Sequence, residues 1–291
     1  MRIRIAVGAV AVFVLALLVW GFVIEPDRLV VHEARLALPR WPAELAGLRI
    51  AVLADVHAGA PHVDVDKVRR IVAIVEHTRP DLVVLLGDYV AGFRRTGLWG
   101  PIPPEDTARV LASLHPPLGV FAVLGNHDWW FDGARVRDAL RAAGIVVLEN
   151  EAVPVTRDGE VLWLVGLADL WTRWPDVAGA LRGVPDGAPA IVLSHNPDVF
   201  PDVPSRVALT LAGHTHGGQV LLPLIGRPVV PSRYGQRYAA GHVVEDGRHL
   251  FVTTGIGTSV IPIRLGVPPE IVVVTIVGAD VTARNAKAGS R

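Results

Sequence analysis

Five short motifs along the chain carry side chains of the kinds that bind metal ions in proteins. They read LADVH, LLGD, GNHD, LSHNPD and GHTH, and each follows a run of apolar residues typical of a buried strand. Their candidate functional residues are Asp55, His57, Asp88, Asn126, His127, Asp128, His195, His214 and His216. Carboxylate, imidazole and amide donors without a thiolate suit Mn²⁺, Fe or Zn²⁺ better than soft metals. The motifs therefore predict a metal site with nitrogen and oxygen ligands.

The number of candidate ligands indicates two ions. One ion rarely needs seven protein donors, whereas two ions about 3.5 to 4 Å apart that share a carboxylate use about that number. Glycine precedes Asp88, Asn126 and His214, and a residue without Cβ allows a sharp turn and a close approach of metal or phosphate. We therefore expect two divalent metal ions, Mn, Fe or Zn, as cofactors.

Each motif taken alone has an ordinary structural explanation. Most histidines in proteins lie on the surface or form hydrogen bonds in the core, and Gly87 with Asp88 is also typical of a turn that ends a strand. The GHTH motif is harder to explain by packing, because two histidines at alternate positions are followed by Gly217 and Gly218. The metal interpretation rests on the ordered set of five.

The apolar pattern predicts the elements that position these motifs. Strands are expected at 48–54, 82–86, 120–124 and 145–148, with helices at 63–77, 106–114 and 134–143 between them. Hairpins are expected at 153–165 and 243–252, each around an Asp-Gly turn. Parallel units followed by hairpins predict an α/β fold of two mixed sheets packed face to face, with helices outside. Ligands bind beyond the carboxyl ends of strands in such folds, so the five motifs can converge.

The N-terminal region contains a long uncharged segment. Residues 5–24 carry no charge, and a helix of about 20 residues spans the ~30 Å hydrocarbon core of a bilayer. A cleavable signal peptide and a buried core helix are the alternatives, but Glu25, Pro26 and Asp27 follow directly instead of a small-residue cleavage site. We expect a single-pass membrane anchor with a cytoplasmic N-terminus and an external, periplasmic catalytic domain.

Composition and proline placement complete the expected organisation. Residues 1–24 form a short tail and the anchor, 25–46 with three prolines form a linker, 47–280 form the catalytic domain, and 281–291 form a flexible tail. The 28 basic and 28 acidic residues balance, so no specific nucleic-acid binding is expected. The chain has no cysteine, which excludes disulfides and thiolate chemistry. The sequence does not define an oligomeric state.

The tryptophans divide into two groups. Trp129 and Trp130 directly follow GNHD, so we expect both at the rim of the site. For most of Trp163, Trp171 and Trp174 we expect core packing, and the alternative is an apolar wall near the site or near the membrane face.

The ordered motifs D-x-H, GD, GNHD, H and GHTH resemble the signature of the calcineurin-like metallophosphoesterase superfamily over residues 48–275. GHTHGGQ at 213–219, SRYGQRY at 232–238 and TGIGTSVIPIRLGVPPEI at 255–271 further resemble its membrane-associated or exported bacterial subgroup, which includes YkuE and YaeI proteins. The resemblance implies a four-layer αββα sandwich with a dinuclear centre between the sheets.

The resemblance also implies a role for each residue. The first metal would be bound by Asp55, His57 and His216, the second by Asn126, His195 and His214, and Asp88 would bridge them. His127 would face the scissile phosphate, and Asp128 would hold the His127 ring and raise its basicity. A hydroxide bridging the metals would attack the phosphorus in line.

The expected function is metal-dependent hydrolysis of a phosphomonoester, phosphodiester or pyrophosphate bond, with a lipid-linked substrate as one form of it. The alternative is a membrane-anchored protein that binds metal or phosphate without catalysis. Structural metal sites are usually closed by protein ligands and need no His127–Asp128 pair, which argues against this alternative. A metal-dependent peptidase is disfavoured because the chain lacks HExxH.

Overall fold

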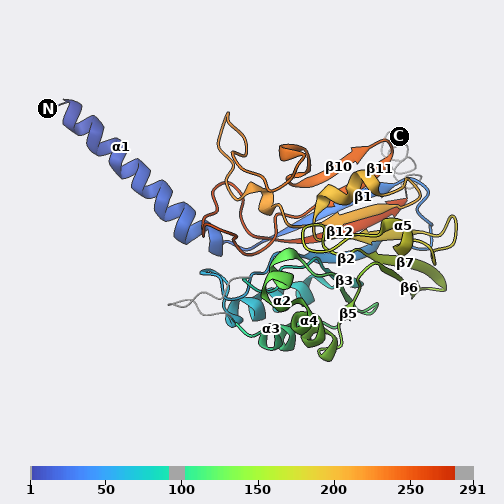
Figure 1. The fold of residues 1–291 in the computed structure, drawn as a ribbon. Helices are drawn as coiled ribbons and strands as arrows, with labels where there is room; N and C mark the ends of the chain where they lie inside the picture. The colour runs from blue at the N-terminus through green and yellow to red at the C-terminus, as the bar shows by residue number, and fades with distance from the viewer. Residues whose placement is uncertain (1, 92–101, 279–291) are drawn as a thin grey trace.

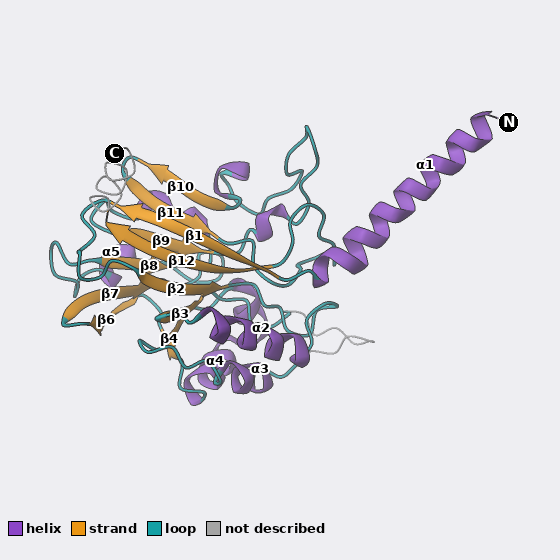
Figure 2. Ribbon diagram, turned by 180° about the vertical axis from the view of Figure 1, so that it is seen from behind, coloured by secondary structure: helices purple, strands orange, loops and turns teal. Residues whose placement is uncertain are grey.

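The computed structural model describes residues 2–91 and 102–278, which form two six-stranded β-sheets with helices on the outside (Figures 1 and 2). The first sheet has the order β1 (Val30–Leu38), β12 (Glu270–Gly278), β2 (Leu48–Leu53), β3 (Leu82–Leu85), β4 (Val120–Ala122) and β5 (Val146–Val147). All its neighbours are parallel except β12 and β2.

The second sheet has the order β10 (Gly241–Glu245), β11 (Arg248–Val252), β9 (Leu209–Ala212), β8 (Ala190–Leu193), β7 (Glu160–Gly166) and β6 (Glu151–Arg157). Its two outer pairs are antiparallel, and its four central strands run parallel. Both predicted hairpins are present, as β6 with β7 and β10 with β11.

Alternation along the strands divides the apolar residues between two faces of the first sheet. Ala51 and Leu53 of β2 pack with α2 (Val65–Thr78), α3 (Pro104–Leu111) and α4 (Asn126–Ala142), whereas Ile50 and Val52 face the second sheet. Successive side chains of a strand point to opposite faces, so one strand supplies two cores. A thinner layer, with α5 (Val177–Ala180) and the 3₁₀ segment η3 (Pro197–Asp202), packs on the other face of the second sheet. The predicted fold class is confirmed.

The segment expected to be a linker instead begins the first sheet. Strand β1 lies within 25–46 and pairs with β12 in parallel over its whole length, with Leu36 and Leu38 buried. Pro26 and Pro39 lie just outside the strand, where they remove none of its hydrogen bonds. Glu33 and Arg35 of β1 are exposed on the face opposite Leu36 and Leu38, whereas His32 shares the face of those leucines and contacts the buried Phe251 ring. Three polar residues in a short run hide the strand character of this segment in the sequence. The tail expected at 281–291 lies outside the described residues.

The N-terminal segment stands away from the sandwich. It comprises α1 (Arg2–Val19), a π-helical turn η1 (Trp20–Ile24) and a 3₁₀ turn η2 (Glu25–Asp27), and α1 projects alone from one end of the domain (Figures 1 and 2). No residue of α1 is buried, which rules out the core-helix alternative. Residues Arg2–Asp27 are long and apolar enough to cross a membrane.

Candidate metal centre

The candidate ligands come from both sheets and meet at the carboxyl ends of parallel strands. Asp55 and His57 follow β2, Asp88 follows β3, and Asn126 begins α4 after β4. The second sheet contributes His195 after β8, and His214 with His216 after β9. All seven side chains are buried, with exposed fractions of at most 4%. The convergence expected from the positions of the motifs is present.

One group of donors lies around His57. Its Nε2 is 3.1 Å from Nε2 of His216, which in turn lies 3.5 Å from Oδ1 of Asp55. Two donors bound at about 2.1 Å to one ion at right angles are about 3 Å apart. The spacing of these three atoms therefore fits one metal ion.

A second group lies around His195. Its Nε2 is 3.1 Å from Oδ1 of Asn126 and 3.1 Å from Nδ1 of His214. The Nδ1 atom of His195 is 2.8 Å from the carbonyl oxygen of Leu86. A hydrogen bond donated there fixes the tautomer that presents Nε2 to a metal.

Asp88 lies between the two groups. Its Oδ2 atom is 3.6 Å from Nε2 of His57 and 3.3 Å from Nε2 of His195. Its other oxygen accepts a hydrogen bond from the backbone N–H of His127 at 2.8 Å. The Asp88 carboxylate thus faces both sets of donors, and the hydrogen bond from the His127 backbone fixes its orientation.

The electrostatic environment lowers the pKa of most of these imidazoles, so they are neutral, which is the form that binds a metal ion. Burial, with a further contribution from nearby histidines, lowers the pKa of both His57 and His214 to about 3. His195 is the exception: burial opposes its charged form, but Asp88 and Asp55 outweigh burial and raise its pKa to about 10. Burial would also raise the pKa of Asp88, but the surrounding histidines, His195 first, lower it well below its usual value. These opposite shifts in pKa favour the charged forms of both His195 and Asp88, whose Nε2 and Oδ2 atoms lie 3.3 Å apart.

The backbone is strained at the same positions. Five candidate ligands, none of them glycine, have positive φ angles between 47° and 68°: Asp55, His57, Asp88, His214 and His216. Such angles cost free energy for residues with a Cβ and cluster at functional sites. Packing therefore maintains a ligand geometry that the local chain disfavours.

Comparison with known proteins agrees with this geometry. The family model for calcineurin-like phosphoesterases matches residues 48–218. The chain belongs to the calcineurin-like phosphoesterase family. It is a metal-dependent phosphoester hydrolase, and the non-catalytic alternative is not supported.

Three relatives cover most of this phosphoesterase. It is 34% identical to the phosphodiesterase YaeI of Escherichia coli, with 87% of this chain and 90% of YaeI aligned. It is 29% identical to the metallophosphoesterase YkuE of Bacillus subtilis, over 87% of each chain. It is 28% identical to the UDP-2,3-diacylglucosamine pyrophosphatase LpxG of Chlamydia trachomatis, over 87% and 91% respectively. The predicted family and bacterial subgroup are confirmed.

Both carboxylate oxygens of Asp128 in this phosphoesterase accept hydrogen bonds from backbone groups, contrary to the expected pairing with the His127 ring. Its Oδ2 accepts hydrogen bonds from the backbone N–H groups of Gly125 and Asp88, and its Oδ1 from those of Tyr89 and Val90. The predicted pairing is wrong because the first turn of α4 points this carboxylate at the loop after β3. Asp128 positions that loop, and hence Asp88.

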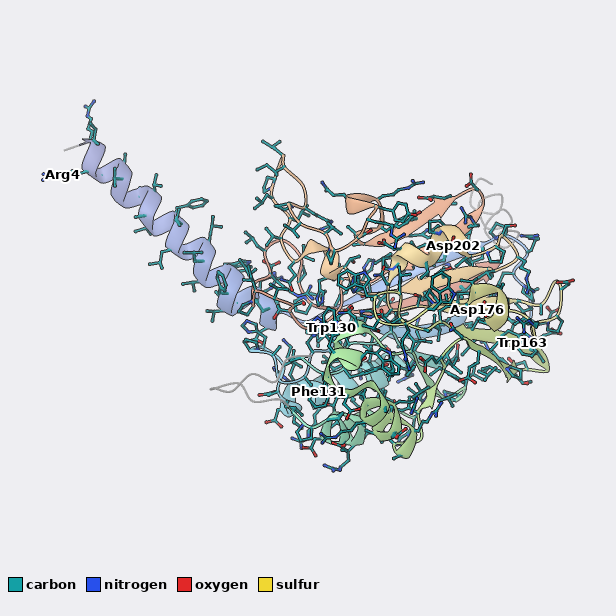
Figure 3. All side chains as sticks on the ribbon, in the orientation of Figure 1. Arg4, Trp130, Phe131, Trp163, Asp176 and Asp202 are labelled. Atoms are coloured by element: carbon teal, nitrogen blue, oxygen red, sulfur yellow. The ribbon has the colours of Figure 1, made fainter. Side chains whose placement is uncertain are left out.

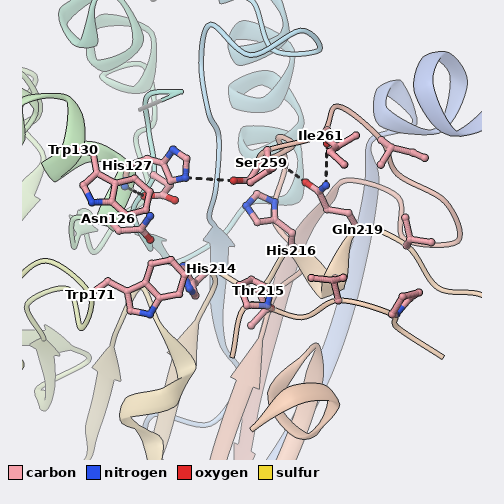
Figure 4. A pocket seen from close by; sticks show the side chains of 18 residues that line it. Asn126, His127, Trp130, Trp171, His214, Thr215, His216, Gln219, Ser259 and Ile261 are labelled. Carbon is pink, nitrogen blue, oxygen red and sulfur yellow. Dashed lines mark hydrogen bonds between the residues drawn. The ribbon is translucent and has the colours of Figure 1, made fainter. Parts of the chain in front are cut away.

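The His127 ring lines the pocket beside the candidate ligands. Its Nδ1 lies 3.3 Å from the carbonyl oxygen of Ala91 and its Nε2 lies 3.3 Å from Oγ of Ser259, and Figure 4 shows the ring directed toward Ser259. The ring also contacts the His57 ring edge-on at 4.6 Å. This places an imidazole next to the first group of donors.

The phosphoesterase pocket has a volume of about 500 Å³. Trp130 and Trp171 line one side, with their ring centroids 6.2 Å apart, and Trp171 contacts the His214 ring edge-on (Figure 4). Trp171 therefore takes the alternative position beside the site and not one in the core. Trp129 does not line the pocket and packs against the Arg173 guanidinium. Trp174 is also not in the core, because 81% of it is exposed.

Sequence reasoning missed the polar residues on the opposite side of the pocket. Ser259 contacts the His127 ring, and Gln219 accepts a hydrogen bond from the Ser259 backbone while donating one to the Ile261 carbonyl. The sequence did contain a signal for both residues, because Gln219 ends the GHTHGGQ motif and Ser259 lies within the motif at 255–271. These two segments are joined across the pocket.

Proposed function

We propose that this phosphoesterase hydrolyses its substrate at a dinuclear metal centre. Asp55, His57 and His216 would hold the first ion, and Asn126, His195 and His214 would hold the second. Asp88 would be shared between them. The observation that carries this proposal is the position of Asp88 Oδ2, 3.6 Å from His57 and 3.3 Å from His195.

The protein positions the reacting groups around that centre. Bound divalent ions supply activation of water and neutralisation of charge on the phosphoryl oxygens. His127 lies at the edge of the centre, where its ring contacts a phosphoryl oxygen or donates a proton to the leaving oxygen. Trp130 and Trp171 limit the access of bulk water on their side of the pocket and pack against apolar parts of the substrate.

The substrate we propose is an amphiphilic or lipid-linked phosphodiester or pyrophosphate. Apolar side chains from residues 220–231 and 259–263 line the pocket beside the metal ligands. Two relatives are named as a phosphodiesterase and a diacylglucosamine pyrophosphatase. Both observations favour a charged phosphate group joined to an apolar portion.

We further propose that α1 anchors the enzyme in a membrane, with the catalytic domain on the external side. The uncharged run 5–24 supports an anchor, and Arg2 with Arg4 before it supports a cytoplasmic N-terminus.

Hydrolysis by the full-length protein in detergent tests the proposed function. The protein is stripped of metal, supplied with Mn²⁺, Zn²⁺ or Fe²⁺, and assayed on p-nitrophenyl phosphate and bis(p-nitrophenyl) phosphate. Metal should restore activity in the wild type and in Asp186→Asn, a control at a fully exposed carboxylate, but not in Asp88→Asn. Activity that survives chelation, or that Asp88→Asn retains, would refute the proposed centre.

A further inference from the structure

Two loops beside the pocket expose large apolar side chains to solvent. We call residues 220–231 and 259–263 the mouth loops. Leu224 is fully exposed, Val260 is 87% exposed, and the other exposed apolar residues are Leu221, Ile225, Val229 and Ile261. Single exposed apolar residues are common, but a contiguous group on adjacent loops marks an interaction surface.

Hydrogen bonds link each mouth loop to a residue that flanks the other loop. Leu221 N–H donates to the Leu265 carbonyl at 2.8 Å, and the Gln219 side chain donates to the Ile261 carbonyl at 3.0 Å. Leu222 and Gly226 exchange backbone hydrogen bonds in a tight turn that presents Leu224 and Ile225 at its tip. The apolar residues are therefore held outward by an ordered framework.

The same framework is attached to the base of the N-terminal helix. Arg264 N–H donates to the Gly21 carbonyl at 2.9 Å, and Gly266 N–H donates to the buried Glu25 carboxylate at 2.9 Å. Trp20 donates its indole N–H to the same carboxylate oxygen. A Cβ on Gly21 would lie 3.1 Å from Ile263, so glycine permits this close approach.

The helix and the mouth loops also lie at the same end of the domain. In Figures 1 and 2, α1 and the protruding loop after η4 (His216–Gly218), orange in Figure 1, extend from the same end of the domain. Figure 3 shows side chains standing out from both. The protruding loop therefore lies at the end of the domain that faces a membrane crossed by α1.

We propose that the mouth loops insert into the interface of the bilayer that α1 crosses, as a second membrane contact. The proposal rests on the anchor assigned under the proposed function. Indole side chains favour the membrane interface. Trp20 at the base of the helix therefore places that interface at the depth of the mouth loops. Val260 and Ile261 belong both to the exposed surface and to the pocket lining. The pocket therefore opens onto the lipid, and an amphiphilic ester can reach the metal centre without its apolar portion crossing water.

Site-directed spin labelling of the full-length protein tests this contact. The chain contains no cysteine, so Leu224→Cys, Val260→Cys and the control Val244→Cys each give one labelling site. Val244 is 53% exposed on β10 and lies in neither mouth loop. The protein is placed in vesicles of phosphatidylcholine and phosphatidylglycerol, and the spin relaxation rate of each label is measured with oxygen or with a water-soluble nickel complex. Oxygen should accelerate the relaxation of the labels at 224 and 260 more than the nickel complex does. The nickel complex should have the larger effect on the label at 244.

Two results would overturn the membrane contact. Labels at 224 and 260 that respond like the label at 244 would place the loops in water. Labels shielded from both reagents, with spin–spin broadening that disappears on dilution with unlabelled protein, would show that a second copy of the chain covers the loops.

A functional experiment separates this inference from the proposed chemistry. The double variant Leu224→Asp with Ile225→Asp lies outside the pocket lining and should hydrolyse soluble bis(p-nitrophenyl) phosphate as the wild type does. Its turnover of hexadecyl p-nitrophenyl phosphate in vesicles should fall about tenfold, and that of Val244→Asp should not. Equal turnover of the vesicle-borne ester by the double variant and the wild type would contradict the inference. If the wild type hydrolysed neither ester, that result would count against the proposed function. The spin-label experiment would still test the membrane contact independently.

Discussion

The backbone N–H of His127 donates to Oδ1 of Asp88 at 2.8 Å, so these two residues are joined through the main chain. The His127 ring meanwhile lines the pocket near Ser259. One residue thus supports the Asp88 carboxylate with its backbone and places an imidazole in the pocket with its side chain. The two contributions can be separated by substitution.

His127→Ala should lower kcat by about 10² to 10⁴ while the protein keeps both metal ions, because the substitution removes the ring and leaves the N–H to Asp88. Metal analysis and steady-state kinetics of the purified variant provide the measurement. Ser259→Ala, which removes only a neighbour of the ring, should reduce kcat much less. A loss of metal in parallel with kcat would mean that the His127 ring is itself a ligand.

Gly125→Ala should abolish metal binding at the shared carboxylate. A Cβ at Gly125 would lie 2.2 Å from Oδ1 of Asp88, whereas one at Gly183 would meet no atom within 4 Å. Gly183→Ala is therefore the matched control and should leave metal content and activity unchanged. Full metal content in Gly125→Ala would show that Asp88 can be displaced without loss of metal binding.

Asp128→Asn should destabilise the metal-free protein by about 2 to 4 kcal/mol, because one amide group cannot accept all the hydrogen bonds that the carboxylate accepts from four backbone N–H groups. Urea denaturation measures this difference. Asp132→Asn, at an exposed carboxylate on the same helix, should change the free energy of unfolding by less than about 0.5 kcal/mol. Equal free energies of unfolding for the two variants would show that Asp128 does not position the loop after β3.

Metal binding should release a proton from His195. In the metal-free protein the pKa of His195 is raised to about 10, so the ring is protonated at neutral pH. His57 and His214, with a pKa of about 3, are already neutral and release none. Metal competes with the His195 proton and, below about pH 7, also with a proton on Asp55, whose pKa burial raises to about 7. Affinity should therefore rise at least about tenfold per pH unit between pH 6 and 8. Calorimetry in buffers of different ionisation enthalpy counts the protons, and a count of zero would contradict this assignment.

The sequence indicated well which polar side chains converge, because each polar motif ends a strongly apolar strand. It failed where position depends on distant packing. Strand β1 has few buried residues and becomes a strand only by pairing with β12 at the other end of the chain. Trp171 reaches the pocket on a loop from the second sheet, and the carboxylate of Asp128 is directed by the helical turn that begins at Asn126. Neither contact has a local signature.

The metal content of the purified chain tests the central claim most directly. Mass spectrometric metal analysis should find two ions per wild-type chain after reconstitution, two in His127→Ala, and fewer than one in Asp88→Asn, because Asp88 faces both groups of donors. A single ion per wild-type chain, or two ions in Asp88→Asn, would contradict a dinuclear centre built on a shared Asp88.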